Sequence, residues 1–183
     1  MALWKKIWSW VTTLGAAVIV SSLIGIFVIQ PYRVEGHSMD PTLHDRERVY
    51  VAKWPHTFSE YPDYGDIVII DSRVDRSRSL GDDVLENPLL QLIRPLNDRV
   101  FFIKRVIGKP GDVLTFKDHK VYRNGQPLDE PYIKETMEYE SDETWTVPDG
   151  HVFVMGDNRN NSEDSRMIGY IPLDHVLGKM IYP

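Results

Sequence analysis

The sequence predicts a mainly β domain behind one N-terminal helix that is long enough to cross a membrane. First, no charged residue lies between Lys6 and Arg33, and this run is mostly apolar. Second, the apolar stretches beyond Arg33 are short and broken by Pro, Gly and Asn, as in strands. Third, none of them shows the long 3.6-residue period of a helix. Because 183 residues hold one medium core plus the helix, we expect a single domain of antiparallel strands.

The composition excludes several classes of protein. With 42% hydrophobic and 26% charged residues, the chain is neither disordered nor a polytopic membrane protein. It has no cysteine, which rules out disulfides and cysteine-based zinc sites. Of 21 basic and 27 acidic residues, only Lys5 and Lys6 precede Arg33, so the remainder carries a net charge of −8. This acidic body argues against nucleic acid as a partner, because phosphate binding needs clustered cations.

We assign residues 10–30 as a transmembrane anchor in contact with membrane lipid. About 20 apolar residues at 1.5 Å rise cross a hydrocarbon layer of roughly 30 Å. Pro31 would stop the helix, and Trp4, Trp8 and Trp10 supply an aromatic belt on the near side. The alternative is a cleavable secretory signal, but the run is too long and no A-x-A-like site follows it.

The charges that flank this anchor predict its orientation. Lys5 and Lys6 place residues 1–9 in the cytoplasm by the positive-inside tendency, although Arg33 flanks the other end. Residues 31–183 then form an extracytoplasmic domain of a single-pass cell-membrane protein.

Within this domain, short apolar runs predict the strands. They cover residues 48–52, 66–70, 100–107, 113–116, 120–122 and 151–155. Asn124-Gly125 after the fifth run predicts a tight turn. We interpret residues 71–98 as an exposed polar insertion, and residues 134–143, with five acidic side chains, as a solvated stretch.

Ser38 is the first residue with potential chemistry. It lies between Gly36 and Pro41, a setting in which a tight turn can hold a hydroxyl exposed. A serine in such a loop is most often only a turn residue. The sequence at this point leaves both interpretations open.

Lys104 is more informative, because alternation along residues 100–107 places it on one face with Val100, Phe102 and Val106. Burial penalises the ammonium form and lowers a lysine pKa, so that a neutral amine can act as a general base. The alternative is an edge-strand lysine whose stem packs while its head reaches water.

A polar run from Gly156 to Arg166 follows the last of these strands. Asx and hydroxyl side chains there can cap the backbone, and Asp can pair with Arg, so a structural network is the default interpretation. The six histidines show no metal-binding spacing such as H-E-x-x-H. A Ser-His-Asp triad stays open, since its members need not be neighbours in sequence.

Four blocks lie in order behind the N-terminal anchor: Ser38–Leu43, Gly65–Val68, Lys104–Asp112 and Gly156–Arg166. Taken together, these blocks and their order resemble bacterial type I signal peptidases. The single anchor and compact domain look like the Gram-positive form.

The resemblance implies a serine endopeptidase that removes signal peptides from exported preproteins at the outer membrane face. Ser38 would be the nucleophile and also the oxyanion donor through its backbone N–H, with Lys104 as general base. Ser162 would orient the amine, and Asp157, Asp164 and Arg166 would support it. The implied fold is a coiled, SH3-like antiparallel sheet without metal or cofactor. Small pockets would select Ala-like side chains at the first and third positions before the cut.

Two positions depart from the family pattern. Gly36 stands where some members carry a serine as second oxyanion donor, so that donor is unassigned. Asn160 replaces a common aspartate, so no charged role is carried over to it.

Two rival functions follow from other classes of protein. A self-cleaving repressor shares the Ser/Lys logic, but it needs a DNA-binding module and has no use for residues 7–29. A non-catalytic membrane-tethered β domain would make Ser38 and Lys104 dispensable.

Overall fold

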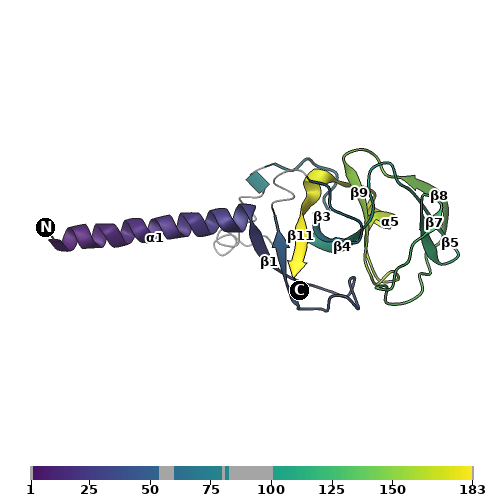
Figure 1. Cartoon of the computed structure of the whole chain (residues 1–183), viewed down its shortest axis with the longest axis horizontal. Helices are drawn as coiled ribbons and strands as arrows, with labels where there is room; N and C mark the ends of the chain where they lie inside the picture. The colour runs from purple at the N-terminus through teal and green to yellow at the C-terminus, as the bar shows by residue number, and fades with distance from the viewer. Residues whose placement is uncertain (1, 54–59, 80, 83–100, 183) are drawn as a thin grey trace.

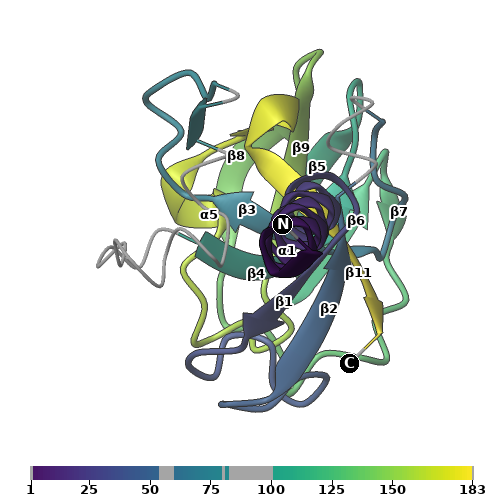
Figure 2. The same ribbon diagram turned by 90° about the vertical axis from the view of Figure 1, so that its left-hand side faces the viewer.

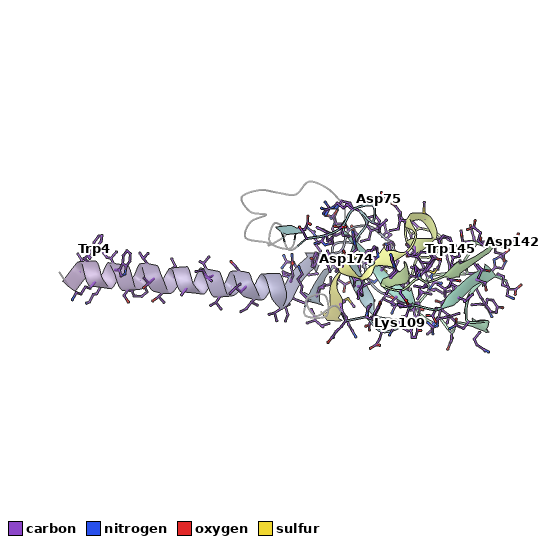
Figure 3. All side chains as sticks on the ribbon, turned by 90° about the horizontal axis from the view of Figure 1, so that it is seen from above. Trp4, Asp75, Lys109, Asp142, Trp145 and Asp174 are labelled. Carbon is purple, nitrogen blue, oxygen red and sulfur yellow. The ribbon has the colours of Figure 1, made fainter. Side chains whose placement is uncertain are left out.

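The computed structural model describes residues 2–53, 60–79, 81–82 and 101–182. Helix α1 (Ala2–Phe27) extends away from the rest of the chain as an isolated rod (Figure 1). Within it, the 22 residues Leu3–Ile24 are long and apolar enough to cross a membrane, and none of their most apolar window is buried inside the protein. Trp4 lies at the end of the rod remote from the domain (Figure 3).

The helix starts and ends earlier than the expected span of residues 10–30. Strand β1 (Ile29–Arg33) already pairs with β2 (Arg48–Ala52) from Ile29 onward. Pro31 therefore lies inside an extended strand instead of just beyond the helix. As β1 is the edge strand of its sheet, a residue without an N–H is tolerated there.

The domain contains two sheets, and every pairing among the described strands is antiparallel. The larger sheet has the order β1-β2-β11-β3-β4-β9-β10 and lies next to α1 (Figure 1). Its remaining strands are β3 (Ile67–Asp71), β4 (Phe101–Gly108), β9 (His151–Met155), β10 (Ile171–Pro172) and β11 (Val176–Tyr182). Register shifts in β11 and between β4 and β9 bend this sheet. The predicted mainly β, curled antiparallel fold is confirmed.

The smaller sheet, of order β7-β6-β5-β8, lies at the end of the domain remote from α1 (Figure 1). Its strands are β5 (Val113–Lys117), β6 (Lys120–Arg123), β7 (Gln126–Pro127) and β8 (Ser141–Thr146). Asn124 and Gly125 join β6 to β7 with φ of 55° and 77°, which confirms the predicted tight turn. Helix α5 (Ser165–Ile168) and a 3-10 turn (Leu173–His175) precede β11.

Buried side chains fix the centre of the large sheet, where β4 lies between β3 and β9. One cluster covers the face that includes Val68, Val106 and Val154, with Phe102 packed against it. Lys104 pairs across the ladder with Val68. Since side chains two residues apart share a face, Lys104 points to the same side as Phe102 and Val106, as predicted. Val100 lies outside the described residues. Figure 2, which looks along α1, shows β3 and β4 beside one another.

The expected polar insertion begins with a buried charge. Asp71 ends β3 with no exposed surface, and its carboxylate pairs with Arg73 at 2.7 Å and with Arg78. These arginines lower the pKa of Asp71 to about 2, although burial alone would raise it. Residues 80 and 83–98 of the insertion lie outside the described residues, so its exposure there stays a prediction.

Candidate active site

Ser38 lies in the loop that joins β1 to β2. Gly36 has a φ of +89°, a conformation that favours glycine, and its N–H donates to Asp45 Oδ1 at 2.9 Å. Met39 and Leu43 are buried in a core cluster with residues of the large sheet. These two buried side chains hold the loop against the large sheet. Ser38 itself is half-buried and faces β4.

The Lys104 side chain meets this serine, with Nζ donating to Ser38 Oγ at 2.9 Å. Lys104 is only 3% exposed, and its Nζ lies 5.1 Å from the centre of the Phe102 ring. Burial lowers the pKa of the amine from 10.5 to about 8, although Asp164, Glu163 and Asp157 oppose that effect. About half of the amines are therefore neutral at pH 8, where an ordinary lysine is almost fully charged.

The run from residues 156 to 166, here called the site loop, packs directly on the serine. Asn158 N–H donates to the Ser38 carbonyl at 3.0 Å, and Asn158 Nδ2 donates to the His37 carbonyl at 2.9 Å. A Cβ added to Gly156 would lie 2.2 Å from Ser162 Oγ and 2.4 Å from the Ser38 carbonyl oxygen. Only glycine permits this approach, so Gly156 brings Ser162 and Ser38 to the same point.

Asp164 and Arg166 pair as predicted. Arg166 Nε and Nη2 donate to the two carboxylate oxygens at 2.8 Å each, and both side chains are buried. Asp164 also accepts from Gly156 N–H at 3.0 Å. Burial would raise the pKa of Asp164, but Arg166 and that N–H lower it overall. The carboxylate therefore stays charged and holds both ends of the site loop.

Asp157 belongs to a neighbouring network that includes two residues not predicted from sequence. Its carboxylate accepts from Arg105 Nε at 2.8 Å, Arg105 Nη2 at 2.6 Å and Thr42 Oγ1 at 2.5 Å. Arg105 follows Lys104 on β4, so its side chain points to the opposite face. The sequence did hold a signal for this pair, because Arg105 is a cation beside the candidate lysine and Asp157 is an acid in the polar run.

Ser162 is close to the centre, but the described contacts give it no bond to Lys104. Its hydroxyl oxygen is buried and makes no hydrogen bond of normal geometry within the described residues. It does lie near enough to Asp164 to help lower the pKa of that carboxyl.

His37 neighbours Ser38 in sequence, but the Ser38 hydroxyl contacts the Lys104 amine. His37 Nδ1 lies 3.4 Å from Asp40 Oδ2, and its side chain is 61% exposed. His175 is buried, but it contacts Asp174 and the Arg73 carbonyl, away from Ser38.

A serine hydroxyl bonded to a buried, desolvated lysine is the arrangement of a serine peptidase that uses lysine as its base. Residues 7–183 match the family model described as signal peptidase, peptidase S26. The chain therefore belongs to the signal peptidase family, which confirms the resemblance predicted from the four blocks.

Individual relatives agree with this placement. Signal peptidase I of Bacillus licheniformis is 38% identical over 185 residues, which cover 95% of this chain and 86% of the relative. A probable signal peptidase I-1 of Synechocystis is 36% identical over 98% of this chain and 83% of its own length. Signal peptidase I S of Bacillus subtilis is 37% identical over 88% and 79%, respectively.

Proposed function

We propose that this signal peptidase removes signal peptides from secreted preproteins with Ser38 as nucleophile and Lys104 as general base. Membership of the family carries the enzyme class, a serine peptidase of family S26. The observation that carries the residue assignment is the 2.9 Å contact between Ser38 Oγ and the buried Lys104 amine.

The first half of the reaction follows from that contact. The neutral amine takes the proton of the Ser38 hydroxyl while Oγ attacks the carbonyl carbon of the scissile peptide bond. The oxyanion that forms accepts a hydrogen bond from Ser38 N–H, the one donor assigned to it. When the C–N bond breaks, the ammonium of Lys104 returns the proton to the leaving amine, which leaves an ester on Ser38.

The second half repeats these roles with water. The neutral Lys104 amine takes a proton from water, whose oxygen attacks the ester carbonyl. Collapse of the second oxyanion releases the signal peptide as a carboxylic acid, and Lys104 returns the proton to Ser38 Oγ. In both halves the surrounding structure supports the amine in two ways. Burial beside Phe102 lowers its pKa, and the Asp164–Arg166 pair holds the loop that covers it.

The location of the enzyme follows from its apolar helix. We propose that Leu3–Ile24 anchors the protein in membrane lipid with its N-terminus in the cytoplasm and the β domain outside. Lys5 and Lys6 near its start favour this orientation, and the three tryptophans beside them suit a membrane interface. Ser38 then lies eleven residues beyond the end of α1 at Phe27, close to where an exported chain emerges.

Cleavage of a signal-peptide substrate by purified full-length protein in detergent tests the assignment. We expect Ser38→Ala and Lys104→Ala each to lose more than about 99% of the wild-type rate while keeping the folded domain, as removal of a member of such a pair usually does. Lys120→Ala, which alters an exposed lysine on β6, is the matched control. If either site variant retained more than a few per cent of activity, with contaminating peptidase excluded, the pair would be wrong.

A further inference from the structure

The residues between β7 and β8 cross the site loop. This segment, residues 129–139, is here called the bridging segment. The prediction that residues 134–143 form a solvated stretch is wrong in part, because Met137 is buried and residues 141–143 belong to β8. Lys134 N–H donates to the Asp157 carbonyl at 3.1 Å. Asn160 Nδ2 donates to the Thr136 carbonyl at 2.9 Å, and Asn160 Oδ1 accepts from Glu138 N–H at 2.8 Å. A carboxylate accepts but does not donate, so asparagine suits this position better than the aspartate common in the family.

The strongest contact between the two segments is a buried ion pair. Arg159 Nη1 and Nη2 donate to the carboxylate of Glu130 at 2.9 and 2.6 Å. The Arg159 side chain is 1% exposed and that of Glu130 is 6% exposed. Arg159 Nε also donates to the Gly156 carbonyl at 3.0 Å. The guanidinium thus connects Glu130 with the glycine that touches both Ser38 and Ser162.

A second connection leads from Glu130 toward β4. Tyr132 OH donates to Glu130 Oε1 at 2.9 Å, and the Tyr132 ring lies 4.0 Å from the guanidinium carbon of Arg105. Arg105 in turn holds Asp157. Burial and the charge of Glu130 raise the pKa of Tyr132, so the phenol keeps its proton as a donor. Glu130 therefore stands at the junction of two contact routes that end on the site loop.

This arrangement is costly if its purpose is stability alone. Taking two charges out of water costs several kcal/mol per ion, and well-packed apolar residues often replace a buried ion pair without loss. What apolar side chains cannot reproduce is the directed hydrogen bond from Arg159 to the Gly156 carbonyl.

We propose that Glu130 is a positioning residue for the Ser38–Lys104 pair, acting through Arg159 and the Gly156 carbonyl. The proposal rests on the proposed function, because it assumes that this pair performs the reaction. Glu130 contacts no reacting atom, so it acts on the rate only through the geometry of the site loop.

Two kinetic properties report on that geometry. Displacement of Gly156 misaligns Ser38 and Lys104, which lowers kcat without a matching change in KM. Loosening of the loop also admits water to the amine, which returns its pKa toward the ordinary value. The charged groups that face the amine are Asp157, Glu163, Asp164 and Arg166, all on the site loop, while β4 contributes the Phe102 ring. The alkaline rise of the rate should then move to higher pH.

The test uses full-length protein in detergent with a signal-peptide substrate. Glu130→Gln removes the charge and keeps the shape. The double variant Glu130→Leu/Arg159→Met removes both charges together, so that no buried ion is left unpaired. Glu135→Gln alters an exposed carboxylate of the same bridging segment and serves as the matched control. Near-UV circular dichroism and thermal unfolding establish that each variant is folded.

We expect Glu130→Gln and the double variant to fold. Their kcat should be at least tenfold below that of wild type, with KM within about twofold. The midpoint of the alkaline rise of the rate should lie at least half a pH unit higher. Glu135→Gln should match wild type. If the folded double variant kept the wild-type kcat and the wild-type midpoint of the alkaline rise, the positioning role would be overturned. Loss of the fold in both variants would also overturn it, because Glu130 would then serve stability alone. Either outcome differs from failure of the Ser38–Lys104 assignment, which would appear as activity in Lys104→Ala.

Discussion

Replacing Lys104 with methionine should make this signal peptidase more stable while it abolishes activity. Methionine has a similar length and no charge, and it would lie against Phe102 on a face that is otherwise apolar. The native state currently holds an amine whose pKa is lowered from 10.5 to about 8 by burial. A fall of this pKa from 10.5 to about 8 corresponds to about 3 kcal/mol of folding free energy. The central residue of the site therefore carries a stability cost.

The pH dependence gives the sign of this effect. Below about pH 8 the amine is charged in both states, so the native state bears the whole penalty of the buried ammonium. Between about pH 8 and 10.5 the unfolded chain binds a proton that the native state has lost, so wild-type stability rises with pH. Above about pH 10.5 the penalty is gone. Lys104→Met should thus exceed wild type by up to about 3 kcal/mol at pH 7, and this excess should shrink across that window.

Urea unfolding of the full-length protein in detergent measures the difference. Trp145 packs against Phe153 and Tyr170, with ring centres 5.5 and 5.7 Å from its own. Near-UV circular dichroism therefore reports the loss of packing in the domain. Lys120→Met, at an exposed position, should change stability by less than about 0.5 kcal/mol at every pH. A stability difference between Lys104→Met and wild type that stays constant from pH 7 to 10.5 would show that the buried ammonium carries no such cost.

Three further predictions concern the lysine, its neighbour and the membrane. Lys104→Arg should be as inactive as Lys104→Ala in the signal-peptide assay at any pH up to 10, because a guanidinium does not deprotonate there; measurable turnover would contradict a base role. Ser162→Ala should lower kcat about tenfold with KM unchanged, because the hydroxyl is buried against Gly156 beside the Ser38 carbonyl; an unchanged kcat would remove Ser162 from the site. Protease added to intact protoplasts should degrade the β domain, as detected by immunoblotting, whereas full protection would reverse the proposed topology.

Short-range sequence patterns predicted those strands and turns whose conformation depends mainly on neighbouring residues. Short apolar runs identified six strands, and alternation along residues 100–107 gave the face on which Lys104 lies. Asn124-Gly125 identified a turn because both residues adopt positive φ.

Five strands were not predicted: the short β7 and β10, β8, the edge strand β1 and the C-terminal β11. The last two show why. Pro31 argued against β1. Strand β11 contains Gly178, which pairs with Ile69 of β3 and lies so close to β2 that an added Cβ would be 2.3 Å from the Ala52 carbonyl oxygen. Such pairings join distant parts of the chain and leave little trace in either segment alone.

The same distinction applies to the site. The six predicted residues come from three segments, and the four family blocks, not the residue types, brought them together. Arg105 was missed although it follows Lys104, because its partner Asp157 lies 52 residues away. Glu130 and Arg159 were missed for the same reason. Their pairing depends on how the bridging segment crosses the site loop, which composition does not reveal.

Direct titration of the Lys104 amine tests most closely whether Lys104 is the general base. NMR of protein labelled at lysine Nζ, with the signal assigned by its absence in Lys104→Met, gives the pKa of this one group. The alkaline limb of the cleavage rate is measured in the same detergent. We expect both midpoints to lie together near pH 8, well below 10.5. An amine that titrates near 10.5 while the rate still rises near pH 8 would contradict the base role of Lys104 and would assign the proton transfer to another group.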